Sequence, residues 1–587
     1  MLRQFADRSV MAPAITLRSF CTDFQQKCEE EHMLKNKLSS VSCDVLVVGA
    51  GLAGLRAAYD CAAAGLQVQL AVKGTLCSGA SFYPLTAALG CQMPKDEEDK
   101  SVFLEEVLET GAGVADPELV KVIIDEILLE SRRLPELGID QEEHMLTGRA
   151  ACFAKTKRKM ADWGGWGEIR RKARGIFEKI ENVTLREHCD LVRLVTAEDR
   201  IAGAILCDKE DNLITVHTGA VILATGGYCG LYKHSLNTSD VCGIGHSVAL
   251  DAGADLINIE FMQFIPGLTA PRYQTLFNEY TLVHTLRAEN DIGEDAMHAY
   301  LPAGVPQAQC FAERALHGPF TTDDRGRYFD LAIMDDAIRR HSERGFTLHY
   351  SSEIFTEQNA YCVGYIPFLK SVGVDLHTQK ISVAPFAHCA NGGIRIDVNG
   401  ATAVPGLYAA GESAGGVHGA DRHGGLATAN SIVFGKRAAA AAVKYVKANE
   451  VAPDYEDAAA VDALLVWLNA GSGKLSAKEV HDEVSELLWY RGNVLREGKL
   501  LQEGLEKLQT LRKNYNALQA AEAASLQFAA QVFHDLRTAE ALLLAMISRE
   551  ESRGSHFRSD FPNRVPDWEG KRLVLNERDG ALKVECI

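Results

Sequence analysis

The fold is decided by residues 44–58, which read Asp44-Val45-Leu46-Val47-Val48-Gly49-Ala50-Gly51-Leu52-Ala53-Gly54-Leu55-Arg56-Ala57-Ala58. The apolar run predicts a buried strand, the glycines predict a tight turn, and the alanine-rich end predicts a helix. Gly49, Gly51 and Gly54 fit the pattern G-x-G-x-x-G, in which the glycines make the turn, admit a pyrophosphate and allow close helix–strand packing. The helix N-terminus adds free N–H groups and a positive dipole end. We therefore expect a dinucleotide site here.

The next strand narrows the choice of dinucleotide. Residues 67–74 read Gln67-Val68-Gln69-Leu70-Ala71-Val72-Lys73-Gly74. An NAD site is expected to end this strand in Asp or Glu, whose carboxylate binds a ribose hydroxyl. Val72 and Lys73 stand there instead, which disfavours NAD.

Length and composition set further bounds. A chain of 587 residues has room for two to four domains, and its 47% hydrophobic content suits an α/β enzyme. The formal charge of -18 disfavours nucleic acid and anionic membranes as partners. No apolar run approaches the roughly 18 residues that a membrane span needs.

The cysteines and the first residues bear on metals and location. The chain has 15 cysteines but no C-x-x-C pair, which argues against a zinc ribbon, an attached haem or a ferredoxin-type cluster. We expect no metal site, and we expect reduced, buried thiols in a cytoplasmic protein, peripheral at most to a membrane complex. Residues 1–40 form an N-terminal extension, which we interpret as a dispensable arm, with a leader sequence as the alternative.

The rest of the chain alternates strands, helices and small-residue turns. Residues 76–90 predict a loop close to a ligand, 101–135 predict helix, 151–175 predict loop, and 184–221 predict antiparallel strands. Residues 220–227 form a second strand with a glycine turn, and 404–412 form a third. Residues 456–548 predict three antiparallel helices, and a strand pair is expected near residues 571–575 and 581–585.

In this order, the motifs resemble the succinate dehydrogenase/fumarate reductase flavoprotein family, which includes L-aspartate oxidase. The matching segments are the glycines of 49–54, Ala224-Thr225-Gly226-Gly227, Phe261-Met262-Gln263-Phe264, His388-Cys389-Ala390-Asn391-Gly392-Gly393-Ile394, Gly411-Glu412, Gly416-Val417-His418-Gly419-Ala420-Asp421-Arg422 and Glu551-Ser552-Arg553-Gly554.

The resemblance implies an α/β fold: a split Rossmann-like FAD-binding domain with an inserted α+β capping domain and a C-terminal helical domain. The expected boundaries are 41–260 and 379–448 for the two FAD-binding parts, 261–378 for the cap, 449–548 for the helices and 549–587 for the tail.

The resemblance also implies bound FAD and a set of residues that hold it. That set is Gly49, Gly51, Gly54, Lys73, Ser81, Ala224, Thr225, Gly226, Gly411, Glu412, Ala427 and Ile432. Respiratory members attach FAD to a histidine in the loop that matches 78–90. This loop contains no histidine, so we expect FAD to be bound non-covalently.

Three catalytic residues follow from the same resemblance. His388 and Arg422 match groups that bind a substrate carboxylate, for which a guanidinium fork is suited. Ile265 replaces a family histidine, so the substrate is expected to differ from fumarate or succinate. Arg287 is our candidate for the family's proton-donor arginine, although the Thr-Glu pair that precedes the family arginine is absent. The alternative donors are Tyr273, Glu279, Tyr280 and His284.

We therefore expect an FAD-dependent oxidoreductase that moves a hydride between flavin N5 and a small carboxylate substrate, by enoate reduction or the reverse dehydrogenation. One alternative is an amino-acid oxidase like L-aspartate oxidase. The other is an electron-transfer subunit of a larger complex, with an iron–sulfur or other electron-transfer subunit as its partner.

Overall fold

The computed structural model describes residues 38–587 except 87, 148–149, 359, 450–451 and 579. The predicted arm or leader therefore lies almost wholly outside the described residues. A five-stranded parallel sheet lies near the centre, in the order β19 (Leu407–Ala409), β11 (Val221–Leu223), β2 (Val45–Val48), β3 (Val68–Val72) and β7 (Val183–Glu187). Its strands are apolar runs, as expected for a sheet covered on both faces.

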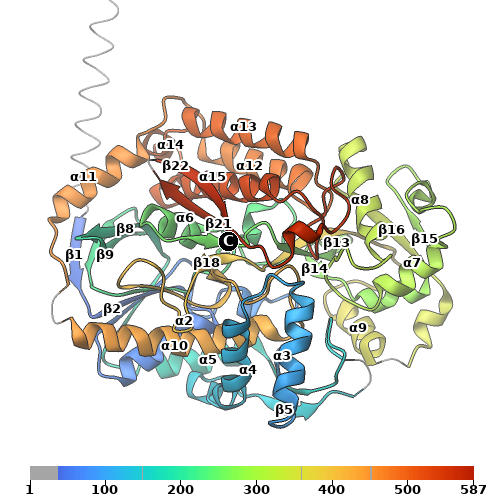
Figure 1. Cartoon of the computed structure of the whole chain (residues 1–587), viewed down its shortest axis with the longest axis horizontal. Helices are drawn as coiled ribbons and strands as arrows, with labels where there is room; N and C mark the ends of the chain where they lie inside the picture. Colours follow the sequence, from blue (N-terminus) through green and yellow to red (C-terminus); the bar gives the residue numbers. More distant parts are fainter. Residues whose placement is uncertain (1–37, 87, 148–149, 359, 450–451, 579) are drawn as a thin grey trace, which may run out of the picture.

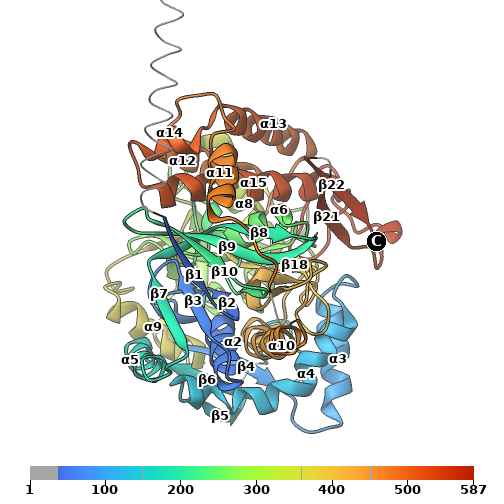
Figure 2. The same cartoon turned by 90° about the vertical axis from the view of Figure 1, so that its left-hand side faces the viewer.

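Two helices from distant parts of the chain cover one face of this sheet. The helix α2 (Leu52–Ala63) directly follows the glycine turn, and α10 (Leu426–Ala448) packs along it. Figure 2 shows the two helices side by side beneath the sheet. The small residues of both helices allow the close approach: a Cβ added at Gly435 would lie 2.6 Å from the carbonyl oxygen of Ala53.

Two further sheets extend this part of the molecule. The first has the order β1 (Leu38–Ser42), β10 (Leu213–His217), β9 (Arg200–Asp208) and β8 (Cys189–Ala197), and β8, β9 and β10 are antiparallel as predicted. The second has the order β4 (Ala88–Met93), β6 (Lys159–Gly164) and β5 (Glu142–Met145). The helices α3 (Asp99–Thr110) and α4 (Pro117–Ser131) occupy most of the predicted helical segment, and α3 begins two residues before it.

The loop predicted for residues 151–175 is wrong over most of its length. The strand β6 is the central strand of its sheet, and α5 (Trp166–Phe177) follows it directly. The glycines of the Trp163–Gly167 segment suggested a loop, but Gly165 only caps the helix. The buried face of α5, with Ile169, Ala173 and Phe177 at a spacing of four, was the signal to follow.

The capping region lies at the right of Figure 1. Its sheet has the order β14 (Thr275–Leu276), β13 (Met262–Ala270), β17 (Ile381–Ala390), β16 (Phe346–Tyr350) and β15 (Thr285–Glu289). The helices α7 (Gln307–Arg314), α8 (Arg327–Arg340) and α9 (Ala360–Ser371) accompany it. The long pair β13–β17 crosses the boundary that we predicted near residue 378, so the cap and the FAD-binding part share one sheet.

Five helices form the layer at the top of Figure 1: α11 (Asp457–Leu468), α12 (Ala477–Arg491), α13 (Gly498–Asn514), α14 (Ala517–Ala521) and α15 (Leu526–Ser548). The prediction of three helices is therefore wrong in number. The buried positions Leu501, Leu505 and Leu508 of α13 recur at intervals of four and three residues, as expected for a helix with one buried face. None of the described helices is long and apolar enough to cross a membrane.

The tail returns to the FAD-binding part. The strands β21 (Leu573–Arg578) and β22 (Ala581–Cys586) form the predicted antiparallel pair, in a sheet with β12 (Leu256–Ile257), β18 (Gly393–Arg395) and β20 (Ala414–Gly415). The helix α6 (Ile244–Asp251) packs nearby. The short 3-10 helices are η1 (Ala80–Phe82), η2 (Leu134–Leu137), η3 (Cys229–Leu231), η4 (Glu279–His284), η5 (Ala296–Ala299), η6 (Ser352–Phe355), η7 (Gly411–Ser413) and η8 (Pro566–Trp568).

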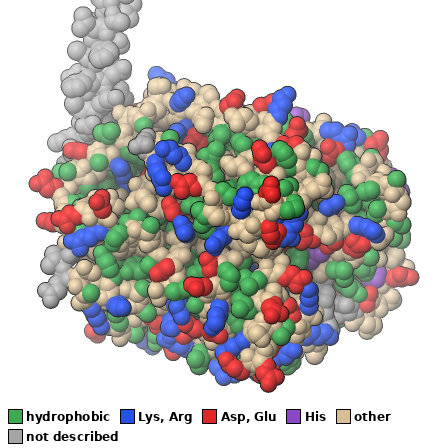
Figure 3. Space-filling view, in the orientation of Figure 1, with side chains coloured by type: hydrophobic (Ala, Val, Ile, Leu, Met, Phe, Trp, Pro, Cys, Tyr) green, Lys and Arg blue, Asp and Glu red, His purple; other side chains and the backbone are tan. Residues whose placement is uncertain are grey.

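The surface carries charge of both signs. On the face drawn in Figure 3, acidic and basic side chains alternate over the whole described area rather than gathering by sign. A nucleic-acid surface would concentrate Lys and Arg in one patch or stripe. The face drawn in Figure 3 has no such patch or stripe among its described residues.

Candidate functional site

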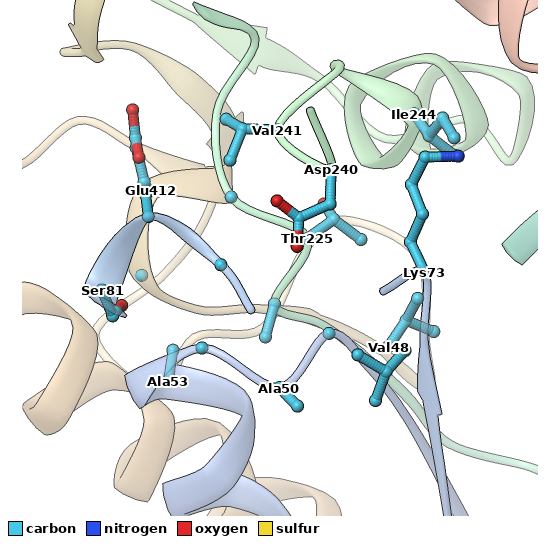
Figure 4. Close-up of a pocket in the computed structure, with 18 of the residues that line it drawn as sticks. Val48, Ala50, Ala53, Lys73, Ser81, Thr225, Asp240, Val241, Ile244 and Glu412 are labelled. Atoms are coloured by element: carbon cyan, nitrogen blue, oxygen red, sulfur yellow. The ribbon is translucent and has the colours of Figure 1, made fainter. Parts of the chain in front are cut away.

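A cavity lies at the carboxyl ends of β2, β3, β11 and β19, and Figure 4 shows its lining. It encloses about 850 Å³, including the part open to solvent. The lining comes from segments 48–53, 72–73, 79–81, 189–191, 224–226, 240–242 and 410–412, with Ile244 and Ser431. The edge where parallel strands end is the expected place for a ligand in a doubly wound sheet.

The glycines of the first turn shape this cavity as the fingerprint requires. Gly49 has a φ of +104°, and a Cβ there would lie 2.2 Å from the carbonyl oxygen of Ala224. A Cβ at Gly54 would lie 1.8 Å from the carbonyl oxygen of Gly49, so the third glycine allows α2 to pack against the turn. Gly51 caps α2, and the first helical N–H, at Leu52, points to the Ser81 hydroxyl at 3.3 Å. A free helix N-terminus in a glycine cradle suits a pyrophosphate.

Several buried polar atoms along the cavity have no hydrogen-bond partner among the described residues. They include Oδ1 of Asp190 and the hydroxyl of Thr225. The other Asp190 oxygen forms an ion pair with Lys73, and Asp240 accepts a hydrogen bond of 2.8 Å from Ser78. Buried polar groups are normally paired, so these atoms fit a ligand rich in hydroxyl and phosphate groups, as FAD is.

Glu412 lies across the cavity from Lys73 in Figure 4. Its Oε1 accepts a hydrogen bond of 2.8 Å from the backbone N–H of Ala390, and burial raises the pKa of its carboxyl. Gly411 also lines the cavity, with a φ of +71°. The carboxyl therefore links the cavity to the end of β17, two residues beyond His388.

Most of the residues that we expected to bind FAD line the cavity, but three of them do not. Ala224, Thr225, Gly226 and Ser81 line the cavity together with Gly49, Gly51, Lys73, Gly411 and Glu412. Gly54 lies behind the turn, and neither Ala427 nor Ile432 is among the lining residues. The side chain of Ile432 is buried in the core, and Ser431 faces the cavity instead. The prediction missed Asp190 and Asp240, although an isolated acid in an apolar strand or a small-residue turn was a usable signal.

His388 and Arg422 come together through β13. Gln263 of β13 lies opposite Cys389, and its Oε1 accepts a hydrogen bond of 3.1 Å from Nε of Arg422. Burial and the charge of Arg422 lower the pKa of His388 to about 3, so its imidazole is neutral at pH 7. Its Nδ1 is buried and finds no hydrogen-bond partner within the described part of the chain. A guanidinium beside a neutral imidazole is a suitable pair for a carboxylate.

The loop that carries Arg422 is held from three sides. The carbonyl oxygen of Ala420 accepts hydrogen bonds from Asn391, after β17, and from the Ser555 hydroxyl and N–H of the tail, at 3.2, 2.8 and 3.1 Å. From the cap, the Thr321 hydroxyl donates to Asp421 at 2.7 Å. The position of Arg422 therefore depends on the FAD-binding part, the tail and the cap together.

The structure does not bring Arg287 to this group. Its Nη2 donates to the carbonyl oxygen of Gly293 at 2.5 Å, and its side chain is 41% exposed. Arg287 pairs with His349 on β16, next to Leu348, which pairs with Ile381 on β17. His388 lies seven residues further along β17, which is roughly 23 Å at about 3.3 Å per residue.

A different arginine of the cap lies closer. Arg327 begins α8, and its Nη1 donates to the carbonyl oxygen of Thr322 at 2.6 Å, one residue from the Thr321–Asp421 contact. Its Nε is buried and has no partner in the part of the chain that the structure describes. The signal missed in the sequence is the polar segment 321–327, which leads directly into α8. Ile265 is 8% exposed and lies opposite Phe386, so this wall is apolar as expected.

Two of the other donor candidates, Tyr273 and His284, are held in contacts of their own. The Tyr273 hydroxyl bonds to His234 at 2.9 Å, and Nε2 of His284 lies 3.0 Å from Glu357. Glu279 and Tyr280 belong to η4.

Comparisons with known proteins agree with this geometry. The model of an FAD binding domain matches residues 44–427, and that of the fumarate reductase flavoprotein C-terminal domain matches residues 481–586. A fumarate reductase (CoM/CoB) subunit from Methanothermobacter marburgensis is 29% identical, with 91% of this chain and 97% of that protein covered. An L-aspartate oxidase from Streptomyces coelicolor is also 29% identical, with 93% of each chain covered.

Among solved structures, Mycobacterium smegmatis Sdh1 in complex with UQ1 has a TM-score of 0.77 at 25% identity and 94% coverage of both chains. Most of this chain is matched by family models, and the cavity has the expected glycine cradle. The chain therefore belongs to the fumarate reductase/succinate dehydrogenase flavoprotein family and is an FAD-dependent oxidoreductase.

Proposed function

We propose that the protein reduces a carbon–carbon double bond next to a carboxylate, or catalyses the reverse dehydrogenation. The observation that carries this proposal is the position of Arg422, which Gln263 holds opposite the end of β17, where the neutral His388 lies and where Glu412 of the FAD cavity is bonded to Ala390. The bound flavin supplies hydride chemistry. The residues described below bind and orient the substrate beside it.

Arg422 and His388 have distinct tasks in this proposal. The Arg422 guanidinium binds the substrate carboxylate with two parallel hydrogen bonds. The neutral imidazole of His388 donates a third hydrogen bond, and Gln263 fixes the guanidinium plane. Negative charge that develops on the carboxylate side of an enoate is stabilised by both groups. They accelerate the reaction to the extent that they bind this charge more tightly than the substrate itself.

The proton for the α-carbon comes from the cap in this proposal. We assign this role to Arg327 rather than Arg287, because Arg327 lies beside the Thr321–Asp421 contact. An arginine normally stays protonated, so the transfer requires a relay that restores its proton. Ile265 leaves the far end of the substrate site without the family's imidazole, which favours a substrate with an apolar or differently polar tail.

A panel of enoates tests this function. FAD-loaded protein is assayed with reduced methyl viologen and carboxylated alkenes that differ at the end remote from the carboxylate. Turnover is expected with at least one of them, and Arg422→Lys is expected to abolish most of it. Absence of turnover with every carboxylated alkene would defeat the proposal. Acid precipitation tests the binding mode: non-covalent FAD stays in the supernatant.

A second candidate is an amino-acid oxidase activity, favoured by the similarity to L-aspartate oxidase. Formation of peroxide with L-aspartate would support it. In either case the electrons need an exchange partner. The described residues hold no cluster of His, Cys, Asp and Glu suited to a metal ion. We infer an electron-transfer partner, because the Mycobacterium smegmatis Sdh1 complex is among the structural neighbours.

A further inference from the structure

A second, larger cavity lies where the FAD-binding part, the cap and the helical layer meet. Its volume is about 1580 Å³, including the part that is open to solvent. Tyr83 and Thr238 come from the FAD-binding part, Gln274 comes from the cap, and Glu486 comes from α12. Ligand sites are frequent at such junctions. The substrate groups His388 and Arg422 are not among the residues that line it.

The two cavities share two walls. In one wall, Ala80 and Ser81 face the FAD cavity, while Tyr83 faces the second cavity. In the other wall, Asp240 faces the FAD cavity, and Thr238 faces the second one. The hydrogen bond of 2.8 Å from Ser78 to Asp240 joins these walls. The same two segments of backbone therefore contribute residues to both cavities.

The second cavity offers polar contacts and an excess of negative charge. The Ser235 side chain lines it, is 6% exposed, and has a hydroxyl without a hydrogen-bond partner among the residues described. Two carboxylates, Asp482 and Glu486, stand one turn apart on α12. Lys233 lies 2.5 Å from Glu343 and 4.0 Å from Glu486, so its charge is balanced.

Two other basic groups at or beside this cavity are also paired. His481 bonds to the buried Asp535 at 3.0 Å, and Lys478 pairs with Asp482 at 2.5 Å. Together with the direct partners, the carboxylates at this cavity are four and the basic groups are three: Asp482, Glu486, Glu343 and Asp535 against Lys233, Lys478 and His481. This excess of carboxylates disfavours an anionic ligand. The overall charge of -18 acts in the same direction.

We propose that the second cavity is the docking site of a small aromatic electron carrier that is neutral or cationic. This inference rests on the proposed function, and it takes a small molecule rather than a protein subunit as the electron donor. A recess enclosed by three parts of the molecule suits a small molecule, with the aromatic wall of Tyr83 beside it. Two carriers, each oxidised by one electron, supply the two electrons that saturate one double bond. Solvent supplies the two protons.

The test uses two viologens of different charge. Reduced methyl viologen is a monocation, whereas reduced propyl viologen sulfonate is a monoanion because of its two sulfonates. Glu486→Gln is expected to raise the KM for reduced methyl viologen about fivefold at low salt and to have little effect at high salt, as for a partly exposed charge. The KM for the sulfonate is expected to stay the same or to fall, and the KM for the enoate is expected to stay within twofold. The matched control is Glu483→Gln, because Glu483 is also on α12 but pairs with Lys507 outside the cavity.

A binding measurement that needs no turnover accompanies the kinetics. Calorimetric titration of oxidised methyl viologen into the FAD-loaded protein is expected to give a Kd that rises with Glu486→Gln and with Ser239→Trp, which fills the cavity from an exposed position. Unchanged Kd values in both variants, with normal FAD content, would overturn the assignment while enoate reduction survived. Failure of the proposed function alone would instead abolish turnover with both viologens and leave the variant effect on Kd.

Discussion

Replacement of Gly54 by alanine tests the physical basis of cofactor binding. A Cβ there would lie 1.8 Å from the carbonyl oxygen of Gly49, whereas real Cβ contacts stay beyond 3.0 Å. The contact is with backbone, so no flexible side chain can move away. The start of α2 must therefore shift from the turn by at least the difference, 1.2 Å.

That shift is large compared with the geometry of a hydrogen bond. An N–H of the first turn that meets a phosphate oxygen at about 2.9 Å would move to about 4 Å, where the hydrogen bond is lost. A hydrogen bond to a charged group contributes about 1.5–3 kcal/mol. The loss of two such bonds amounts to about 3–6 kcal/mol, which weakens binding by about 10²–10⁴-fold at about 1.4 kcal/mol per factor of ten.

The assay is the FAD content of the purified variant, measured by visible absorbance, followed by titration of the apoprotein with FAD. Gly175→Ala is the matched control. Gly175 lies inside α5 with nothing within 4 Å of an added Cβ, so this variant is expected to gain up to about 1 kcal/mol of stability and keep its FAD. If Gly54→Ala bound FAD as tightly as the wild type, the assignment of the glycine turn to the pyrophosphate would be refuted.

Four further predictions concern the substrate side. Arg422→Lys keeps the charge but loses the fork, so kcat/KM for the enoate is expected to fall about 10²-fold or more with normal FAD content. Arg287→Ala is expected to stay within about twofold of the wild type in kcat, whereas Arg327→Ala falls by more than tenfold; equal effects would contradict the new assignment. Thr321→Val is expected to raise the KM for the enoate, and Thr321→Ser to restore it, if the cap positions Arg422 through its hydrogen bond. The pKa of His388 is about 3 in the folded protein, against an ordinary value of 6.5, so the unfolded chain binds a proton at this residue at higher pH than the folded chain does. The free energy of unfolding therefore falls as the pH falls from about 6.5 towards 3. Thermal melts of His388→Gln over this pH range are expected to show a smaller loss of stability.

The sequence was sufficient for features that depend on local backbone chemistry. The glycine turn after β2 has one physical solution, because Gly49 needs a positive φ and Gly54 needs the absence of a Cβ. The Leu501, Leu505 and Leu508 spacing predicted a buried helix face for a similar reason. Each of these patterns involves only a short segment of sequence, so it can be interpreted without knowing which distant residues pack against it.

Features that depend on long-range register were not accessible in this way. Arg287 fitted the resemblance by its order in the chain, but the strand register of the cap places it far along the sheet from His388. Arg327 was missed because its position depends on how segment 320–322 meets Asp421. Asp190 contributes to the FAD cavity from a neighbouring sheet, and its pairing with Lys73 spans more than a hundred residues.

The FAD-binding part is divided into two by the cap, and its second part carries the last strand of the parallel sheet and the site residues that follow it. The strand β19 completes the parallel sheet beside β11, and only after it does the chain reach Glu412 and then Arg422. The capping region is inserted before this return, so β17 carries His388 back from the cap to the sheet. The β13–β17 pair therefore connects the cofactor cavity to the proposed carboxylate-binding groups, through the contact of Glu412 with Ala390 and that of Gln263 with Arg422. The hydrogen bond from Thr321 to Asp421 joins the cap to the loop that holds Arg422, so we propose that the position of the cap and substrate binding at Arg422 are coupled.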